Sequence, residues 1–462
     1  MANSTTRQLP NVTAIALAAA AVGCFHVACL VEPAGVVVVL YLASIYALAW
    51  VKTARWAFYL GLGIGMMIAA PQLWFFQVIF GPAAVGLWAI LGVWVGLFLL
   101  LSHLAVRRWP VAGRWMIPVF WLSLEYFRSE LYPLRFAWLT PGTCLSNPQW
   151  SFLASMGVYG FSFLVLLTLV VLDSAQIANR RTLLVFALLP ASLFFLPGRF
   201  ADSRASNGNG PYVTGIQLEG PTVPEVIEAL NRARQDNPET DLYVLSEYTF
   251  DDVPPPEILS WCREHRCHLI AGGKDPVPGE STFRNTAFVV SPEGEIVFRQ
   301  SKSVPVQFMS DGLPAQSQAL WESPWGRIGI AICYDLSYSR VVDRLIELGA
   351  EALIVPTMDA EDWGPHEHWL HAKIAPIRAK EYGVPIVRLA SSGISQLVHA
   401  DGTVSASAPI PGQGERLKGT LPLSSGGRRP LDRYLALPAI AATGCFLVFL
   451  GFDRFRKWRI PS

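Results

Sequence analysis

The sequence contains few charged residues. Asp, Glu, Lys and Arg make up 15% of the 462 residues, whereas 52% are hydrophobic. This shortage excludes a disordered chain, which needs a polar and charged composition, and it also excludes an ordinary soluble enzyme. Basic residues are not in excess either, since 36 Lys and Arg stand against 35 Asp and Glu. A strongly basic nucleic-acid binder is therefore excluded, because binding to phosphates needs a positively charged surface.

The scarce charges are distributed unevenly along the chain. Residues 1–200 contain eleven Lys or Arg and four Asp or Glu, and residues 431–462 contain five and two. Residues 201–430 contain twenty and twenty-nine, so the only segment with the composition of a water-soluble domain is acidic, with a net charge of −9. The composition predicts membrane segments on both sides of one soluble-type domain.

Long apolar runs indicate about eight membrane spans, because about 20 apolar residues cross the hydrocarbon core. The second, fifth and seventh runs are the shortest. The runs cover residues 13–31, 35–50, 56–80, 83–105, 112–127, 153–172, 182–197 and 434–451.

Basic residues in alternate loops predict the orientation of these spans. If the N-terminus with Arg7 is cytoplasmic, the positive-inside rule is followed in every loop except the one that holds Arg128 and Arg135. The acidic domain then lies outside the cytoplasm. Residues 21–24 loosely resemble a lipoprotein cleavage site, but the apolar run continues beyond them, which favours a retained first helix. The cytoplasmic basic residues are Lys52, Arg55, Arg107, Arg108, Arg114, Arg180, Arg181, Arg454, Arg456, Lys457 and Arg459.

Two charged residues stand inside an apolar run. Glu125 and Arg128 are three residues apart and share one helix face, where they can pair. Two interpretations stay open: an ion pair at an interfacial helix end, or a contact with a lipid headgroup.

The segment between the spans alternates strand-like and helix-like patterns, which predicts an α/β layered fold. Turn-rich joints at 205–210 and 424–427 flank it, so the expected domains are 1–204, 205–428 and 429–462. Expected strands cover 212–217, 242–245, 268–271, 286–290, 328–332, 352–355 and 386–389, and expected helices cover 224–234, 256–266, 338–349 and 367–382.

Three residues at the ends of expected strands are candidates for chemistry. Cys333 follows an apolar strand and precedes a helical turn, whose N–H groups stabilise a thiolate or an oxyanion. Glu247 is placed to act as a general base, and Lys302 can stabilise negative charge. Each residue alone is more often structural: a buried Cys, a solvated strand end and a hairpin Lys. The combination indicates catalysis.

The order Glu247, Lys302, Cys333 resembles the nitrilase or carbon–nitrogen hydrolase superfamily, whose triad appears in this order on a four-layer αββα sandwich. A domain of that kind before a final span resembles the bacterial apolipoprotein N-acyltransferases in particular. Further segments that resemble this family are 56–63, 121–129, 157–164, 363–368, 377–385 and 392–395.

The sequence departs from the family pattern at several positions. The family has a Pro-Phe-Gly-Glu run shortly after its Lys, and here a second glutamate is missing unless Asp311 substitutes for it after a shift. Asp335 replaces the glutamate that normally follows Cys-Tyr. Two more runs, at 217–219 and 358–363, also differ from the family, so an amidase or a catalytically diverged binding protein stays open as an alternative.

Further residues are expected around the triad. Tyr334 and Asp335 are expected beside the nucleophile, and Trp363 and His368 match the family's segment after the Cys. Phe308 belongs to an apolar run, 304–309, that is expected either to form an acyl-chain wall or membrane-dipping loop, or to pack in the core.

The remaining His and Cys residues do not predict a metal site. Neither His366, His368 and His371 nor the cluster at 262–268 has a recognised zinc spacing. Cys262 and Cys267 are expected either as a disulfide or as two free thiols.

The resemblance implies a function: transfer of an acyl chain from a glycerophospholipid, through a thioester on Cys333, to the N-terminal amine of a diacylated lipoprotein. It implies a multi-pass protein of the bacterial cytoplasmic membrane, with the catalytic domain on the extracytoplasmic side. The lipid bilayer is a further expected partner, and neither a cofactor nor nucleic acid is expected.

Overall fold

The computed structural model describes residues 8–147, 149–175, 210–412, 414 and 416–459. The chain forms two compact units. The first unit consists of three stretches of chain: one that ends at Leu145, one that begins at Ser155 and one that begins at Pro430. The second unit consists of Ser146–Ala154 and the region that ends at Arg429.

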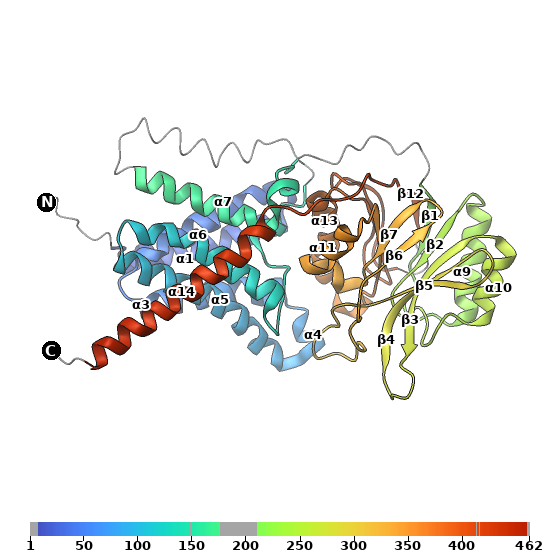
Figure 1. Cartoon of the computed structure of the whole chain (residues 1–462), viewed down its shortest axis with the longest axis horizontal. Helices are drawn as coiled ribbons and strands as arrows, with labels where there is room; N and C mark the ends of the chain where they lie inside the picture. Colours follow the sequence, from blue (N-terminus) through green and yellow to red (C-terminus); the bar gives the residue numbers. More distant parts are fainter. Residues whose placement is uncertain (1–7, 148, 176–209, 413, 415, 460–462) are drawn as a thin grey trace. The chain divides into compact units, whose positions relative to one another are not determined.

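The first unit is helical because its sequence consists of long apolar runs separated by short polar breaks (Figure 1). The first apolar runs form α1 (Asn11–Leu30) and α2 (Val38–Ala47). The other helices are α3 (Ala54–Gln72), α4 (Phe76–Phe80), α5 (Ala84–Arg108), α6 (Met116–Tyr126), α7 (Leu153–Ala175) and α14 (Asp432–Arg459), with shorter turns at η1 (Glu32–Val37), η5 (Phe127–Leu131) and η6 (Pro141–Cys144).

Five helical segments of the described residues are long and apolar enough to cross a membrane. The expected runs at 56–80 and 112–127 are not among them, and the run at 182–197, Arg180, Arg181 and the joint up to residue 209 lie outside the described residues. The count of about eight spans therefore stays a prediction. The five segments are Asn11–Leu30, Glu32–Trp50, Phe76–Arg108, Leu153–Ser174 and Asp432–Arg456.

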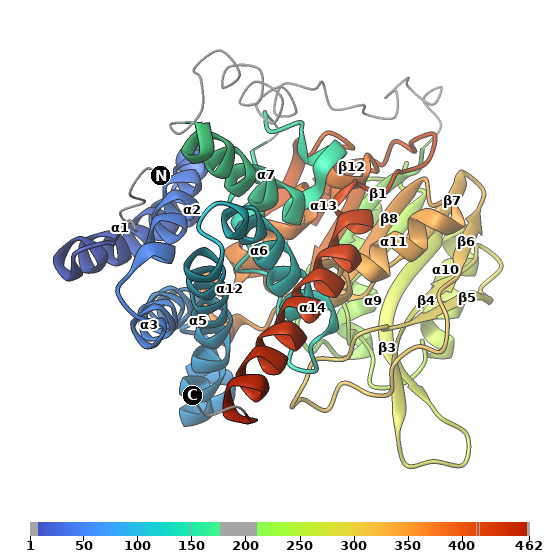
Figure 2. The same cartoon turned by 60° about the vertical axis from the view of Figure 1, so that its left-hand side comes forward.

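Helices α3 and α5 pack side by side at very short range (Figure 2). Gly61 and Gly65 of α3 face Gly92 and Gly96 of α5, and a Cβ atom at Gly61 would lie 2.5 Å from the Val95 carbonyl oxygen. The absence of side chains on both helices permits this approach, which maximises van der Waals contact where no hydrophobic effect drives helix association.

The last helix is attached to α7 through one carboxylate. Asp432, at the start of α14, is fully buried and accepts hydrogen bonds from the backbone N–H groups of Tyr159 (3.1 Å) and Gly160 (3.2 Å). Gly157 has φ of 74° at a kink in α7 and leaves room for this carboxylate, which a Cβ would meet. Backbone N–H groups released by the kink are thereby satisfied inside the helical unit.

The second unit contains two six-stranded sheets between two layers of helices (Figure 1). The strand orders are β12-β1-β2-β3-β4-β5 and β11-β10-β9-β8-β7-β6. Neighbours β1, β2 and β3 are parallel, as are β7, β8 and β9, and the outer pairs of each sheet are antiparallel. Helices α9 and α10 cover the first sheet, and α11 and α13 cover the second.

The central strands are apolar and buried, as expected for parallel strands covered on both faces. The strands are β1 (Tyr212–Ile216), β2 (Leu242–Leu245), β3 (His268–Pro276), β4 (Phe283–Val290), β5 (Ile296–Ser301), β6 (Leu320–Ser323), β7 (Gly326–Ile330), β8 (Ala352–Thr357), β9 (Ile386–Ala390), β10 (Ser395–Val398), β11 (Val404–Ala408) and β12 (Arg416–Thr420). The helices are α9 (Val223–Asp236), α10 (Pro256–His265), α11 (Ser339–Leu348), α12 (Pro365–Ala372) and α13 (Ile374–Tyr382), with short turns at η7 (Cys333–Ser337) and η8 (Glu361–Trp363).

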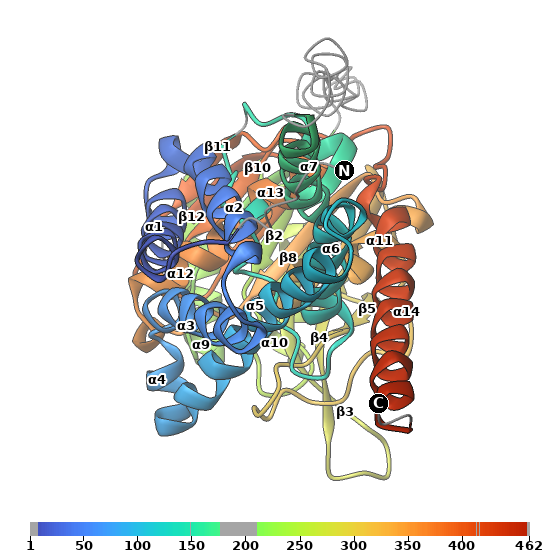
Figure 3. The same ribbon diagram turned by 90° about the vertical axis from the view of Figure 1, so that its left-hand side faces the viewer.

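The structure adds five strands that the sequence prediction lacked, β5, β6, β10, β11 and β12, and three of the expected elements differ clearly. The helix expected over 367–382 is two helices, because Pro376 lacks the N–H group that a continuous helix would need there. The strand expected over 328–332 ends at Ile330. The strand expected over 268–271 continues to Pro276 and forms a long hairpin with β4 that projects from its sheet (Figure 3).

The α3–α5 contact generates a prediction about two glycines of one helix. The substitution Gly61→Ala places a methyl group against the α5 backbone and is expected to destabilise the protein by about 1–3 kcal/mol through overpacking. Gly63→Ala is the matched control, because no atom lies within 4 Å of a Cβ there. Thermal unfolding of the purified chain in detergent measures both; equal midpoints for the two variants would contradict the proposed close packing.

Candidate active site

The three residues singled out in the sequence come from three strand ends of the second unit. Glu247 lies two residues beyond β2, Lys302 follows β5 directly, and Cys333 is the first residue of η7 after β7. The Lys302 ammonium lies 2.9 Å from Glu247 Oε1, and the side chains of both residues are almost fully buried.

Cys333 and Glu247 both contact the backbone of one residue, Met358. The Cys333 thiol points at the Met358 carbonyl oxygen at 3.7 Å, and the Met358 N–H donates to Glu247 Oε2 at 2.8 Å. Met358 directly follows β8, the parallel neighbour of β7. The ends of neighbouring strands therefore bring the nucleophile and the carboxylate to the two backbone polar groups of one residue, Met358.

The backbone holds Cys333 in an unusual conformation. Its φ is 51°, a left-handed value that a residue with a Cβ seldom adopts and that is common where a nucleophile sits on a sharp strand-to-helix turn. Such a conformation persists only where the surrounding structure imposes it, and it is concentrated at functional sites.

The resting thiol is protonated. Burial raises the pKa of Cys333 well above its usual value, and the negative charge of Glu247 raises it further, whereas Lys302 lowers it. Burial alone would lower the pKa of Lys302, but Glu247, Cys333 and Asp311 together raise it well above the usual value, so the ammonium is charged. A thiolate thus forms only when a base takes the proton, and Glu247 is placed to be that base.

Asp311, the expected candidate to substitute for the second glutamate, pairs with Lys302. Its carboxylate lies 2.7 Å from Lys302 Nζ and accepts hydrogen bonds from the Tyr248 hydroxyl (2.6 Å) and the Val306 N–H (2.7 Å). Burial opposes ionisation, but Lys302 and these donors lower the pKa of Asp311. Lys302 therefore lies between two carboxylates, which balance its buried charge.

Asn285 is a site residue that sequence reasoning missed. Its side-chain Nδ2 donates to Glu247 Oε1 at 2.6 Å and to Asp311 Oδ1 at 2.7 Å. Its backbone carbonyl accepts a hydrogen bond from the backbone N–H of Lys302 at 2.7 Å. One fully buried amide thus fixes both carboxylates around Lys302. The only sequence signal is an amide within an otherwise largely apolar strand, β4.

Asp335 fastens the loop after Lys302 to the turn that carries Cys333. Its carboxylate accepts hydrogen bonds from the N–H groups of Ser303 (3.0 Å), Val304 (2.7 Å) and Ile332 (3.2 Å). Burial raises the pKa of Asp335 to about 6, although these donors oppose that rise. Asp335 is thus both a turn-capping group and a positioning residue for Lys302 and Cys333.

The other expected residues lie around this group in different ways. Tyr334 is buried against Tyr338, with ring centroids 4.9 Å apart. His368 is buried and donates from Nε2 to the Ala360 carbonyl at 2.8 Å, and Trp363 ends the short turn η8. Phe308 is 71% exposed at φ of 67°, so the alternative of core packing is wrong for this residue.

A buried network supports the site beyond the triad. Asp359 pairs with Arg388 at 2.5 Å and accepts a hydrogen bond from His371 at 2.7 Å, and Glu367 lies 3.7 Å from the same His371. Asp359, Glu367 and His371 are close enough to one another to share a cation. Arg388 already supplies a positive charge at Asp359, so the arrangement does not favour a metal ion.

The cysteines of this unit other than Cys333 lie away from the triad. Cys262 and Cys267 are buried free thiols with interacting side chains, so the alternative of two free thiols describes the structure. Both pack in the core beneath α9 and α10.

Comparisons with known proteins find related sequences along most of the chain. Residues 257–423 match the carbon–nitrogen hydrolase family model, a range that includes Lys302 and Cys333. An apolipoprotein N-acyltransferase from Geobacter metallireducens is 25% identical over 421 residues, covering 78% of this chain and 80% of that protein. One from Bdellovibrio bacteriovorus is 24% identical, covering 70% and 72%.

The chain is thus similar to apolipoprotein N-acyltransferases over most of its length, and its second unit contains a carbon–nitrogen hydrolase domain. This confirms the resemblance and the nitrilase-like α/β class of the second unit. Among solved structures, the nitrilase-superfamily protein Nit3 of Saccharomyces cerevisiae is 20% identical, covering 47% of this chain and 93% of that chain with a TM-score of 0.39.

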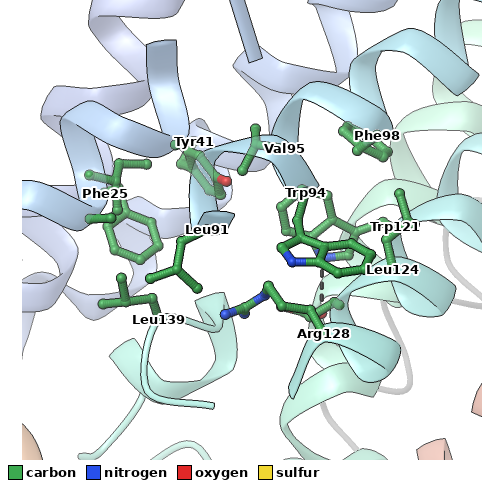
Figure 4. A pocket seen from close by; sticks show the side chains of 14 residues that line it. Phe25, Tyr41, Leu91, Trp94, Val95, Phe98, Trp121, Leu124, Arg128 and Leu139 are labelled. Carbon is green, nitrogen blue, oxygen red and sulfur yellow. Dashed lines mark hydrogen bonds between the residues drawn. The ribbon is translucent and has the colours of Figure 1, made fainter. Parts of the chain in front are cut away.

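The helical unit contains a small cavity of its own. Its lining is aromatic and aliphatic except for Glu125 and Arg128 (Figure 4). Glu125 accepts a hydrogen bond from Trp121 Nε1 at 2.9 Å, and Arg128 donates to the Phe136 carbonyl at 2.7 Å. Both charged residues are buried, and the two interpretations, an ion pair at an interfacial helix end or a contact with a lipid headgroup, stay predictions.

The Lys302 cluster generates a prediction about two Lys–Asp pairs of equal length. The pairs Lys302–Asp311 and Lys274–Asp251 both measure 2.7 Å, but the first is buried and Asp251 is 97% exposed. Asp311→Asn is expected to lower the free energy of unfolding by about 3–5 kcal/mol, because it leaves a buried charge under-compensated. Asp251→Asn is expected to leave the thermal midpoint unchanged; equal effects of the two substitutions would contradict the buried pairing.

Asp335 generates a prediction about pH. Its pKa rises from 3.8 to about 6 on folding, so the folded state binds the proton more tightly than the unfolded state. The stability of the wild type relative to Asp335→Asn is therefore expected to be greatest below about pH 4 and to fall by about 3 kcal/mol as the pH rises to about 6. Unfolding midpoints of both proteins across this range measure the difference; a difference that stays constant or grows with pH would refute the raised pKa.

Proposed function

We propose that this protein transfers a fatty acyl chain from a glycerophospholipid, through a thioester on Cys333, to the N-terminal amine of a diacylglyceryl-cysteine lipoprotein. The observation that carries the proposal is the buried Glu247–Lys302–Asp311 group, connected to the Cys333 thiol through the backbone of Met358. The names of its relatives supply N-acyl transfer to an apolipoprotein, and the phospholipid donor is what the resemblance implies.

The first half-reaction forms the thioester. Glu247 takes the proton of the Cys333 thiol, and the thiolate attacks the ester carbonyl of the phospholipid. Lys302, charged at rest, and the backbone N–H after Cys333 stabilise the oxyanion. When the ester C–O bond breaks, the proton on Glu247 passes to the leaving alkoxide, so that a lysophospholipid departs and Glu247 is again ionised.

The second half-reaction forms the amide. The lipoprotein amine attacks the thioester, the C–S bond breaks, and the amine proton passes through Glu247 to the departing Cys333 thiolate. The enzyme returns to its starting protonation state. An amine is a good nucleophile toward a thioester, so the two-step route suits an amide product.

The apolar loop after Lys302 fits a lipid donor. Phe308 is 71% exposed and Met309 is 41% exposed, whereas Val304 of the same run is buried. We assign the two exposed side chains to contact with acyl chains or the bilayer surface, and the buried one to anchoring the loop. The chain's apolar helices support a location in a membrane, proposed to be the bacterial cytoplasmic membrane, and the loop charges favour the catalytic unit outside the cytoplasm.

The decisive experiment incubates the purified protein with phospholipid and a diacylated lipopeptide. The wild type is expected to acquire an acyl thioester and to produce a triacylated peptide, both detected by mass spectrometry. Cys333→Ala is expected to lose the thioester and to lower the transfer rate at least about 1,000-fold. Glu247→Gln is expected to prevent thioester formation because the amide is not a base. Cys262→Ala, the same substitution at a buried core cysteine, is the control that retains activity.

Two outcomes would redirect the proposal. A thioester that forms but passes to water in the presence of lipopeptide would identify a membrane-tethered hydrolase, the amidase alternative. A wild type that forms neither thioester nor triacylated peptide would refute the transferase and leave a diverged binding protein.

A further inference from the structure

Two cysteines of the helical unit meet across a long stretch of sequence. Cys29 is the penultimate residue of α1, and Cys144 is the last residue of η6, 115 positions further along the chain. Their Sγ atoms are 2.9 Å apart, and both residues are buried. Carbon atoms, which are smaller than sulfur, pack at about 3.5–4.0 Å, so the two sulfurs lie inside ordinary contact distance.

Two close backbone contacts, at Gly35 and Gly142, fix the position of the chain around Cys144. A Cβ atom at Gly35, in η1 just after α1, would collide with the Cys144 carbonyl. A Cβ atom at Gly142 would collide with the backbone of Val158 in α7. Glycine at both positions lets three chain segments approach closely, so the meeting of the two thiols is imposed by the packing of the backbone and is not a chance side-chain rotamer.

Chain connectivity places both thiols on one side of the membrane. Cys29 ends the first span, whose start follows the cytoplasmic N-terminus expected from the loop charges. Cys144 comes two residues before Ser146, where the chain enters the second unit. Under the orientation given in the proposed function, on which this step rests, both cysteines face the oxidising compartment, where disulfides form and persist.

We propose that Cys29 and Cys144 form a disulfide in the mature protein. Each thiol loses its proton, one S–S bond forms, and the two electrons reduce the disulfide of a thiol–disulfide oxidoreductase to its dithiol. The sulfurs need to approach by about 0.9 Å to reach the bond length of about 2.04 Å. The bond would join the end of the first helix to the segment that leads into the catalytic unit.

The test counts free thiols in the full-length protein. Cells expressing it are quenched with acid and N-ethylmaleimide before lysis, and the intact mass gives the number of adducts with and without prior reduction. The sequence has seven cysteines, and the structure joins none of them in a disulfide. The unreduced wild type is expected to take at least two fewer adducts than the reduced protein, at monomer mass.

Two variants of α1 make the result specific. Cys29→Ala is expected to take one more adduct than the unreduced wild type although it has one cysteine fewer, because Cys144 becomes free. Cys24→Ala, in the same helix, is expected to take one fewer. If Cys29→Ala also takes one fewer, or if reduction adds no adduct to the wild type, the disulfide is refuted. Acyl transfer by Cys29→Ala is measured separately, so that a failure of the disulfide proposal can be distinguished from a failure of the transferase proposal.

Discussion

The arrangement of the candidate active site depends on how the second unit compensates one buried positive charge, that of Lys302. Lys302 is 2% exposed, and a lone ammonium in such a place would lose its proton. Glu247 and Asp311 lie within 2.9 Å of it from different segments, and Asn285 holds both carboxylates in position. The loop after β5 must therefore fold back so that Asp311 meets Lys302, and β4 must supply the Asn285 amide. The geometry of the nucleophile's surroundings follows from this charge balance.

The sequence predicts part of this arrangement for a physical reason. Glu247, Lys302 and Cys333 each follow a strand, and the end of a buried strand is a place that the hydrophobic pattern locates well. Asn285 and Asp311 are different, because their roles arise from contacts across the fold. Asn285 lies inside a strand, and Asp311 reaches Lys302 only through a loop whose path depends on hydrogen bonds to Val306 and Tyr248. Local patterns carry no information about such contacts.

The strands of the fold were also predictable from the sequence only in part. The buried central strands were predictable because their residues are almost continuously apolar. The outer strands β5, β11 and β12 were not, since Val404–Ala408 and Arg416–Thr420 are short, polar or interrupted by glycine, and they are strands because a neighbour supplies hydrogen bonds. In the helical unit, hydropathy identifies apolar runs, but it does not show that Glu125 and Arg128 lie against a cavity, which depends on how several helices pack.

The carboxylate of Asp432 imposes an order on biosynthesis. Tyr159 and Gly160 emerge from the ribosome long before Asp432, which follows Tyr159 by 273 residues and comes after the whole α/β unit. Until α14 arrives, the kink of α7 leaves two backbone N–H groups without this acceptor, in a setting where water is scarce. The helical unit is thus completed only when translation has passed the α/β unit, and a chain that stops before Asp432 leaves these two N–H groups without this acceptor.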